Sequence, residues 1–146
     1  MRKTKYRQGK FVPKHIEKYK GNSRNVIYRS SWEKRIMAFF DESSNVQWWN
    51  SEGLIVPYMN PIDKKMHSYF PDFVFMNKNN EVYMVEIKPY RETQPPTRRG
   101  RNYKQQAIVY IINQSKWKQA KEFCAKQNWK FVVWTEKELG KMGINI

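Results

Sequence analysis

The sequence contains few of the residues that form disulfides or bind transition metals. Cys124 is the single cysteine among 146 residues, so neither an intrachain disulfide nor a cysteine-based zinc site can form. The two histidines, His15 and His67, are far apart and lack H-x-x-x-H spacing. This pattern disfavours metalloprotease and histidine-metal nuclease chemistry. A metal bound by this chain would need oxygen ligands, which favours a hard cation such as Mg²⁺.

Long apolar segments are also missing. No apolar run approaches the length that crosses a bilayer, and the initial MRKTKYRQGK is not followed by the apolar stretch of a secretion signal. The sequence also lacks a long basic amphipathic helix, which is the pattern that would indicate binding to a membrane surface. We therefore expect a soluble protein that is neither secreted nor bound to a membrane.

Acidic residues are scarce compared with basic ones. The chain has 13 Asp and Glu against 28 Lys and Arg, which gives a net charge of +15. This excess predicts a polyanionic partner, most simply nucleic acid. Residues 1–29 contain ten basic residues and one acid, Glu17, and we expect an irregular or partly disordered basic arm. Residues 30–146 are expected to form one compact domain.

The spacing of the apolar residues predicts a mixed α/β domain with a central β-sheet flanked by helices, in the order α-βββ-α-β. Ser30 and Glu33 have the S-x-x-E spacing of a helix capping box. The long helix is expected to bury a stripe that includes Tyr110, Ile111 and Trp117. The first expected elements are a helix from Ser30 to about 41–44 and strands at 46–49 and 53–58. A hairpin follows, with strands at 69–76 and 81–88. The last expected elements are a helix over about 102–127, a strand at 129–136 and a short helix in 136–142.

Three charged residues interrupt the apolar strands of the predicted hairpin. Alternation places Glu86 and Lys88 on one face of the second strand, and folding about Asn79 places Asp72 nearly opposite Glu86. A register slip of one residue would place Asp72 beside Val85 instead, and would require a bulge or twist. We therefore expect two carboxylates and an ammonium at one end of the sheet.

Two neighbouring carboxylates repel each other unless a cation lies between them. Asp72, Glu86 and the backbone carbonyl oxygen of Ile87 are candidate ligands for Mg²⁺, with Mn²⁺ as a substitute. Lys88 could orient an attacking water or stabilise the transition state. Together with the basic composition, these residues predict phosphodiester hydrolysis. The alternative is an ordinary ion pair between Glu86 and Lys88 on the solvent face of a strand.

The residues PD at 71–72 and EIK at 86–88 resemble the motif of the PD-(D/E)XK nuclease superfamily. The resemblance implies a restriction-endonuclease-like core made of a helix, a three-stranded meander, a helix and a strand. It also implies that an acid on the first helix completes the metal site, and Glu33 stands at the matching position. The alternative role of Glu33 is to form the helix capping box with Ser30.

Three further segments resemble the T4-like bacteriophage head-completion proteins, namely KYRQGKFVP at 5–13, YRSSWE at 28–33 and VPYMNP at 56–61. The chain is also similar, though less closely, to the catalytic domain of Tn7-type transposase endonuclease subunits. The phage resemblance implies a Mg²⁺-dependent endodeoxyribonuclease that acts on packaged DNA before tail attachment. It implies a location in the virion or in the cytoplasm of the infected bacterium, with portal or head–neck proteins as candidate partners. The sequence leaves the oligomeric state open.

Several basic and polar residues are candidate DNA contacts, because guanidinium groups and helix N-termini both bind phosphate. The candidates are Arg98, Arg99 and Arg101 in the loop TRRGR, Lys104 and Gln105 at the start of the long helix, and Arg29 directly before the first helix. Arg29 could also shape the metal site. Two alternative functions are a non-catalytic DNA-binding structural protein of the virion and an endonuclease of transposition or junction resolution.

Overall fold

The computed structural model describes residues 8–146. The helices and strands, in chain order, are β1 (Gly9–Phe11), β2 (Val26–Tyr28), α1 (Ser31–Glu42), β3 (Val46–Ser51), β4 (Val56–Met59), β5 (Met66–Tyr69), β6 (Phe73–Asn77), β7 (Val82–Ile87), α2 (Tyr103–Lys126), β8 (Lys130–Trp134) and α3 (Glu136–Lys141). Short 3-10 turns lie at Ile16–Lys18 and Tyr90–Thr93.

The central sheet has four strands in the order β3-β6-β7-β8. β3, β6 and β7 form an antiparallel meander, whereas β8 runs parallel to β7 after a crossover through α2. The predicted mixed sheet and the predicted order α-βββ-α-β are therefore confirmed. β4 and β5 form a separate hairpin that is inserted between the first two strands of the meander.

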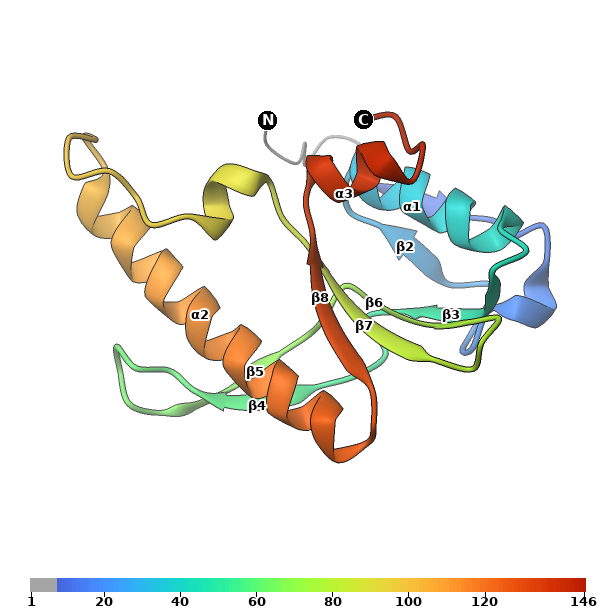
Figure 1. The fold of residues 1–146 in the computed structure, drawn as a ribbon, viewed down its shortest axis with the longest axis horizontal. Helices are drawn as coiled ribbons and strands as arrows, with labels where there is room; N and C mark the ends of the chain where they lie inside the picture. The colour runs from blue at the N-terminus through green and yellow to red at the C-terminus, as the bar shows by residue number, and fades with distance from the viewer. Residues whose placement is uncertain (1–7) are drawn as a thin grey trace.

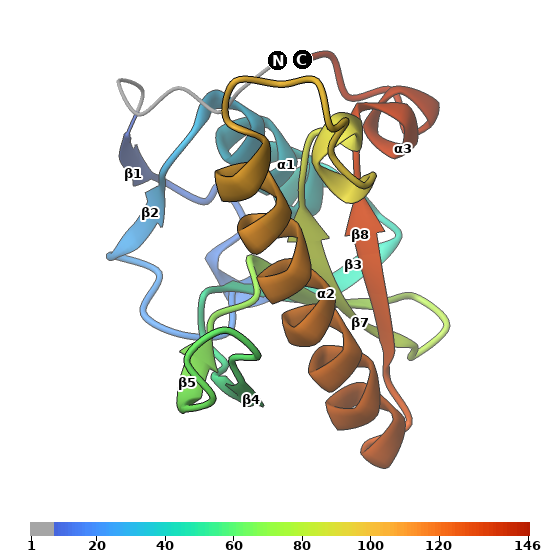
Figure 2. The same ribbon diagram turned by 90° about the vertical axis from the view of Figure 1, so that its left-hand side faces the viewer.

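Helices cover both faces of the central sheet (Figures 1 and 2). One core lies between the sheet, α2 and the β4–β5 hairpin, and includes Val74, Met84, Trp117, Ala120 and Cys124. The other lies beneath α1 and α3, and includes Ile36, Phe40, Phe73, Ile87 and Leu139. Because strand residues alternate between faces, the even-numbered residues of β7 face α2 and the odd-numbered ones face α1.

α1 begins at the predicted N-cap. Ser30 Oγ accepts a hydrogen bond from the N–H of Glu33 at 3.2 Å, and the helix ends at Glu42, within the expected range. The Glu33 carboxylate accepts a hydrogen bond from the N–H of Arg29 at 3.1 Å. Glu33 is thus bound to the residue before the cap, and its side chain is fixed at the start of the helix.

The strand predicted over 69–76 forms two strands in the structure. β5 ends at Tyr69, where it pairs with β4, and β6 begins at Phe73, where it pairs with β7. Pro71 lies between them and has no N–H to contribute to a ladder. As a result, Asp72 lies in a turn directly before β6.

Residues 8–29 of the expected basic arm are mostly irregular, but they include two short strands and a 3-10 turn and are bound to the rest of the domain. β1 and β2 pair with each other, and the N–H groups of Lys14 and His15 donate to the buried Asp41 carboxylate at 2.8 and 3.0 Å. Residues 1–7 lie outside the described residues. The segment from residue 8 is part of the folded domain, because a buried acid of α1 binds its backbone donors.

The buried face of α2 differs from the predicted stripe. Ile111 is 44% exposed. The buried residues of α2 begin only in its third turn, and they are Asn113, Trp117, Ala120 and Cys124. Within residues 8–146, none of the helices combines the length and the apolar character that a bilayer-crossing segment requires.

Replacing Asp41 by alanine should lower the free energy of unfolding by about 2 to 4 kcal/mol, because two backbone N–H groups would lose their acceptor. Equilibrium urea unfolding measures this change. The matched control is Glu42→Ala, which removes only an exposed ion pair with Lys14 at 3.2 Å and should leave stability nearly unchanged. Equal effects of the two substitutions would show that Asp41 does not hold the N-terminal segment.

Candidate active site

The two acids predicted to share a metal ion lie together at the end of the central sheet. β6 and β7 pair Phe73 with Val85, so one further step in the same register places Asp72 opposite Glu86. Their carboxyl groups are in hydrogen-bond contact, and Asp72 Oδ2 also accepts a hydrogen bond from the N–H of Ile87 at 2.8 Å. The predicted pairing without a slip is confirmed. A register shift occurs instead between β3 and β6.

Glu86 is buried on the face of the sheet that α2 covers, with 6% of its surface exposed. Burial raises the pKa of its carboxyl to about 8, and the negative charge of Asp72 acts in the same direction. The charge of Lys88 and the hydroxyl of Tyr69 act to lower this pKa. The alternative of an ordinary ion pair on a solvent face is therefore wrong, because Glu86 is not on a solvent face.

Two donors flank the Glu86 carboxyl. Lys88 Nζ lies 3.8 Å from Oε2, and the Tyr69 hydroxyl donates to Oε1 at 2.9 Å. Burial raises the pKa of Tyr69, and the nearby charge of Glu86 raises it further, so the hydroxyl keeps its proton and acts as a donor. The sequence analysis did not assign Tyr69 to the site. The separation of β5 from β6 is what brings its hydroxyl to Glu86.

Lys116 reaches the site from α2. Its Nζ lies 5.8 Å from the ring centroid of Tyr58 and 5.7 Å from that of Tyr69. Burial lowers the pKa of Lys116, and the charges of Glu86, Lys88 and Asp72 also act on it. The ammonium therefore belongs to the charged groups of this site. A sequence signal existed, since Lys116 is three or four residues from positions in the buried stripe of α2.

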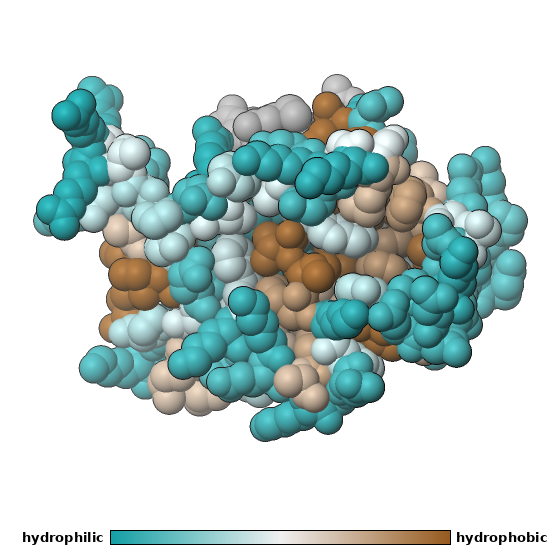
Figure 3. All heavy atoms as spheres, viewed as in Figure 1, coloured by the Kyte–Doolittle hydropathy of each residue, from teal (hydrophilic) through white to brown (hydrophobic). Residues whose placement is uncertain are grey.

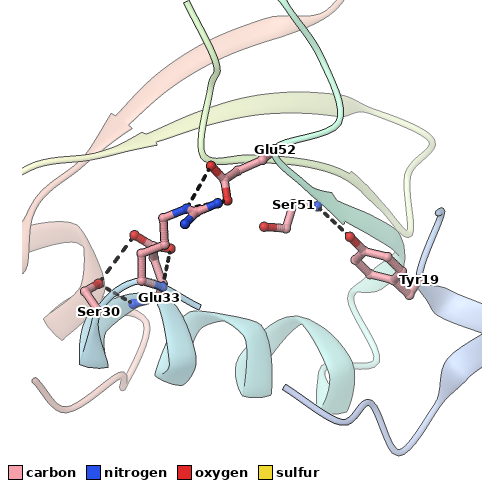
Figure 4. A network of polar contacts seen from close by, with 6 residues as sticks. Tyr19, Ser30, Glu33, Ser51 and Glu52 are labelled. Carbon is pink, nitrogen blue, oxygen red and sulfur yellow. Dashed lines mark hydrogen bonds and ion pairs between the residues drawn. The ribbon is translucent and has the colours of Figure 1, made fainter. Parts of the chain in front are cut away.

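Glu33 lies at the start of α1 in a second polar network, which Figure 4 shows together with Glu52. Arg29 Nε donates to both carboxylate oxygens of Glu52, at 3.0 and 3.2 Å, while the Arg29 N–H binds Glu33. The N–H of Glu52 donates to the backbone carbonyl of Asp72 at 3.1 Å. This network connects the first turn of α1 with the turn that carries Asp72. Glu52 was not among the predicted site residues.

Asp72 and Glu86 have the charge arrangement that a divalent cation would relieve, because they are two carboxyls in contact and one is buried with a raised pKa. Among residues 8–146, no three His, Cys, Asp or Glu side chains come close enough together to hold a metal ion. The structure thus brings together a pair of acids, not a trio. Metal binding by Glu33 and by the carbonyl of Ile87 stays a prediction.

The predicted DNA contacts lie at the surface of the described chain. All six are exposed, namely Arg29 directly before α1, Arg98, Arg99 and Arg101 in the loop before α2, and Lys104 and Gln105 in its first turn. Gln105 also lines a cleft of about 710 Å³ between residues 90–97 and α2. Hydrophilic side chains cover much of the face drawn in Figure 3, with apolar groups gathered near its centre. The roles of these residues and of Arg29 in DNA binding stay predictions.

Two comparisons with known proteins agree with this geometry. The family model described as TnsA-like endonuclease N terminal matches residues 43–136, which include β3 through β8. The chain is also 33% identical over 142 residues to the "Head completion nuclease" of Enterobacteria phage T4. That alignment covers 92% of this chain and 95% of the phage T4 protein. The predicted restriction-endonuclease-like fold class and the resemblance to head-completion nucleases are confirmed.

The raised pKa of Glu86 predicts that metal-free protein loses stability as the pH rises. An unfolded glutamate titrates at about 4.3, so ionisation of Glu86 opposes folding increasingly between that pH and about 8. Glu86→Gln cannot ionise. In EDTA it should unfold at nearly the same temperature as wild type at about pH 4.5, and several degrees higher at about pH 8. Thermal unfolding followed by circular dichroism measures this difference, and a difference independent of pH would contradict it.

Proposed function

Since this chain belongs to the family of TnsA-like endonuclease N-terminal domains, we propose that it is a Mg²⁺-dependent endonuclease that hydrolyses phosphodiester bonds of DNA during phage head completion. The observation that carries the proposal is the contact between Asp72 and the buried Glu86 at the end of β7. A pair of neighbouring acids, one of them buried, is costly to folding on its own, and it is suited to holding a hard cation. The name of the phage T4 relative supports the assignment to head completion.

In this proposal Asp72 and Glu86 hold the metal ion, and the carbonyl of Ile87 adds an oxygen ligand. Glu33 assists at a second metal ion or at the attacking water. When bound, the ion supplies positive charge that stabilises the phosphoryl oxygens and lowers the pKa of a bound water. Mn²⁺, which also prefers oxygen ligands, would substitute for Mg²⁺.

The other residues of the site orient these groups. The Tyr69 hydroxyl fixes Oε1 of Glu86, and the hydrogen bond from the N–H of Ile87 fixes Oδ2 of Asp72. Lys88, 3.8 Å from Oε2 of Glu86, provides a cation beside the carboxyl pair that can orient the water or stabilise charge on the phosphate. The attacking water loses a proton to solvent and its oxygen forms a new bond to phosphorus, while one bridging P–O bond breaks and the leaving oxygen takes up a proton from solvent.

The proposed substrate is the packaged phage DNA, and the proposed place of action is the virion or the cytoplasm of the infected bacterium. The net charge of +15 supports a nucleic-acid substrate, because it provides attraction that does not depend on base sequence. Portal or head–neck proteins stay predicted partners.

Purified protein should nick or cut plasmid DNA with Mg²⁺ and stop when EDTA is added. Glu86→Gln and Asp72→Asn should each reduce the rate at least about 100-fold, because each removes a negative metal ligand. The control is Glu81→Gln, which changes an exposed acid before β7 that pairs with Lys130, and it should cut normally. Mg²⁺ should also raise the unfolding temperature of wild type more than that of Glu86→Gln. Wild type that binds DNA and never cuts it with any divalent ion would favour the non-catalytic structural role.

Glu33→Gln tests the proposed role of the α1 acid separately from its structural contacts. The amide oxygen of glutamine can still accept the hydrogen bond from the N–H of Arg29, so the unfolding temperature should change little. If Glu33 acts on the metal or the water, cutting should fall at least about 10-fold. Unchanged cutting by a folded Glu33→Gln protein would limit Glu33 to its role at the start of α1.

A further inference from the structure

Lys116 brings a positive charge to the carboxyl pair without forming an ion pair of its own within residues 8–146. Its ammonium is positioned by the rings of Tyr58 and Tyr69, at 5.8 and 5.7 Å from their centroids. Lys88, in contrast, lies 3.8 Å from a carboxylate oxygen of Glu86. The two lysines therefore differ in how much of their charge is already neutralised by the protein.

The two tyrosine rings stabilise the Lys116 cation but do not satisfy its hydrogen bonds. An ammonium has three N–H donors, and ring faces attract its charge without replacing oxygen acceptors. Removing part of this group from water therefore has a free-energy cost that cation–π contacts offset only in part. A ligand with acceptor oxygens and negative charge would offset the rest.

The same face of α2 has a second unsatisfied donor. Asn113, one turn before Lys116, is 4% exposed, and its side-chain Nδ2 has no hydrogen-bond partner among the described residues. Residues three apart on a helix lie on the same side. Asn113 therefore places a second donor without an acceptor on the side of α2 that carries Lys116.

Tyr69 connects Lys116 directly to the carboxyl pair. Its hydroxyl donates to Glu86 at 2.9 Å, and its ring lies beneath the Lys116 ammonium. An anionic substrate that approaches Asp72 and Glu86 meets two negative groups, so a cation that is not neutralised must lie beside it. Lys116 is positioned to provide that charge from the α2 side.

We propose that Lys116 is a catalytic residue that binds a non-bridging oxygen of the DNA phosphate at which cleavage occurs. This inference rests on the proposed nuclease function. Lys116 holds the phosphate from the side of α2, while Asp72, Glu86 and Lys88 act from the end of the sheet. Its charge stabilises the additional negative charge that the phosphate acquires as water attacks.

Turnover at saturating DNA provides the first test. Lys116→Met keeps an apolar side chain against the two tyrosines and removes the charge, so kcat should fall about 100-fold while the unfolding temperature stays close to that of wild type. Lys116→Arg should recover part of the loss. The matched control is Lys126→Met, which changes an exposed lysine ten residues further along α2 and should leave kcat unchanged.

The salt dependence of DNA binding provides the second test, and it does not require cutting. In the Glu86→Gln background without divalent ions, a short duplex DNA is titrated at several salt concentrations. Adding Lys116→Met should reduce the slope of log Kobs against log salt by about one, because one phosphate contact is lost.

The two tests together decide the inference. A fall in kcat with an unchanged salt slope would overturn it and make Lys116 a residue that only positions Tyr69 and Glu86. An altered slope with unchanged kcat would also overturn it, because Lys116 would then contact a phosphate away from the cleaved bond. If wild type never cuts DNA and Lys116→Met still reduces the slope of log Kobs against log salt, the proposed nuclease function fails while the phosphate contact of Lys116 stands.

Discussion

The contact between the carboxyl groups of Asp72 and Glu86 is the interaction on which the rest of the site depends. Two acids this close are unfavourable unless the surrounding structure fixes them and supplies positive charge. The pairing of Phe73 with Val85 and the hydrogen bond from the N–H of Ile87 fix Asp72. The Tyr69 hydroxyl donates a hydrogen bond to one carboxylate oxygen of Glu86, and the Lys88 ammonium lies 3.8 Å from the other. The folded chain thus accepts a local cost in stability at the position where the proposed metal ion would bind.

Elements from distant parts of the sequence complete this site. The β4–β5 hairpin contributes Tyr69 and α2 contributes Lys116, while the network of Arg29 and Glu52 links Glu33 at the start of α1 to the turn that carries Asp72. Each of these elements also packs into one of the two cores on either side of the sheet. Packing of the two cores therefore positions the polar groups. A substitution that shifts side chains in either core would also shift the groups around the carboxyl pair.

The central features of the site could be predicted from the sequence because they depend on local geometry. The alternation of a strand and the symmetry of a hairpin suffice to place Asp72 opposite Glu86, and the S-x-x-E spacing identifies the start of α1. Tyr69 and Glu52 could not be found in this way, because tertiary packing brings them to the site from separate elements, whereas the helical spacing of Lys116 in α2 was a usable signal. The attachment of residues 8–29 to the folded domain could not be predicted for the same reason. Their basic composition is typical of an irregular segment, but the carboxylate of Asp41, on a helix further along the chain, binds their backbone.

The inserted β4–β5 hairpin leaves and rejoins the central sheet at a single rung. Ser51 pairs with Phe73, and the N–H of Glu52 binds the carbonyl of Asp72, so the two ends of the insertion are held together whatever lies between them. Because Tyr69 belongs to the insertion, exchanging the hairpin would also exchange the hydroxyl bound to Glu86. The acidity of the buried Glu86 carboxyl therefore depends on a hairpin that lies outside the central sheet.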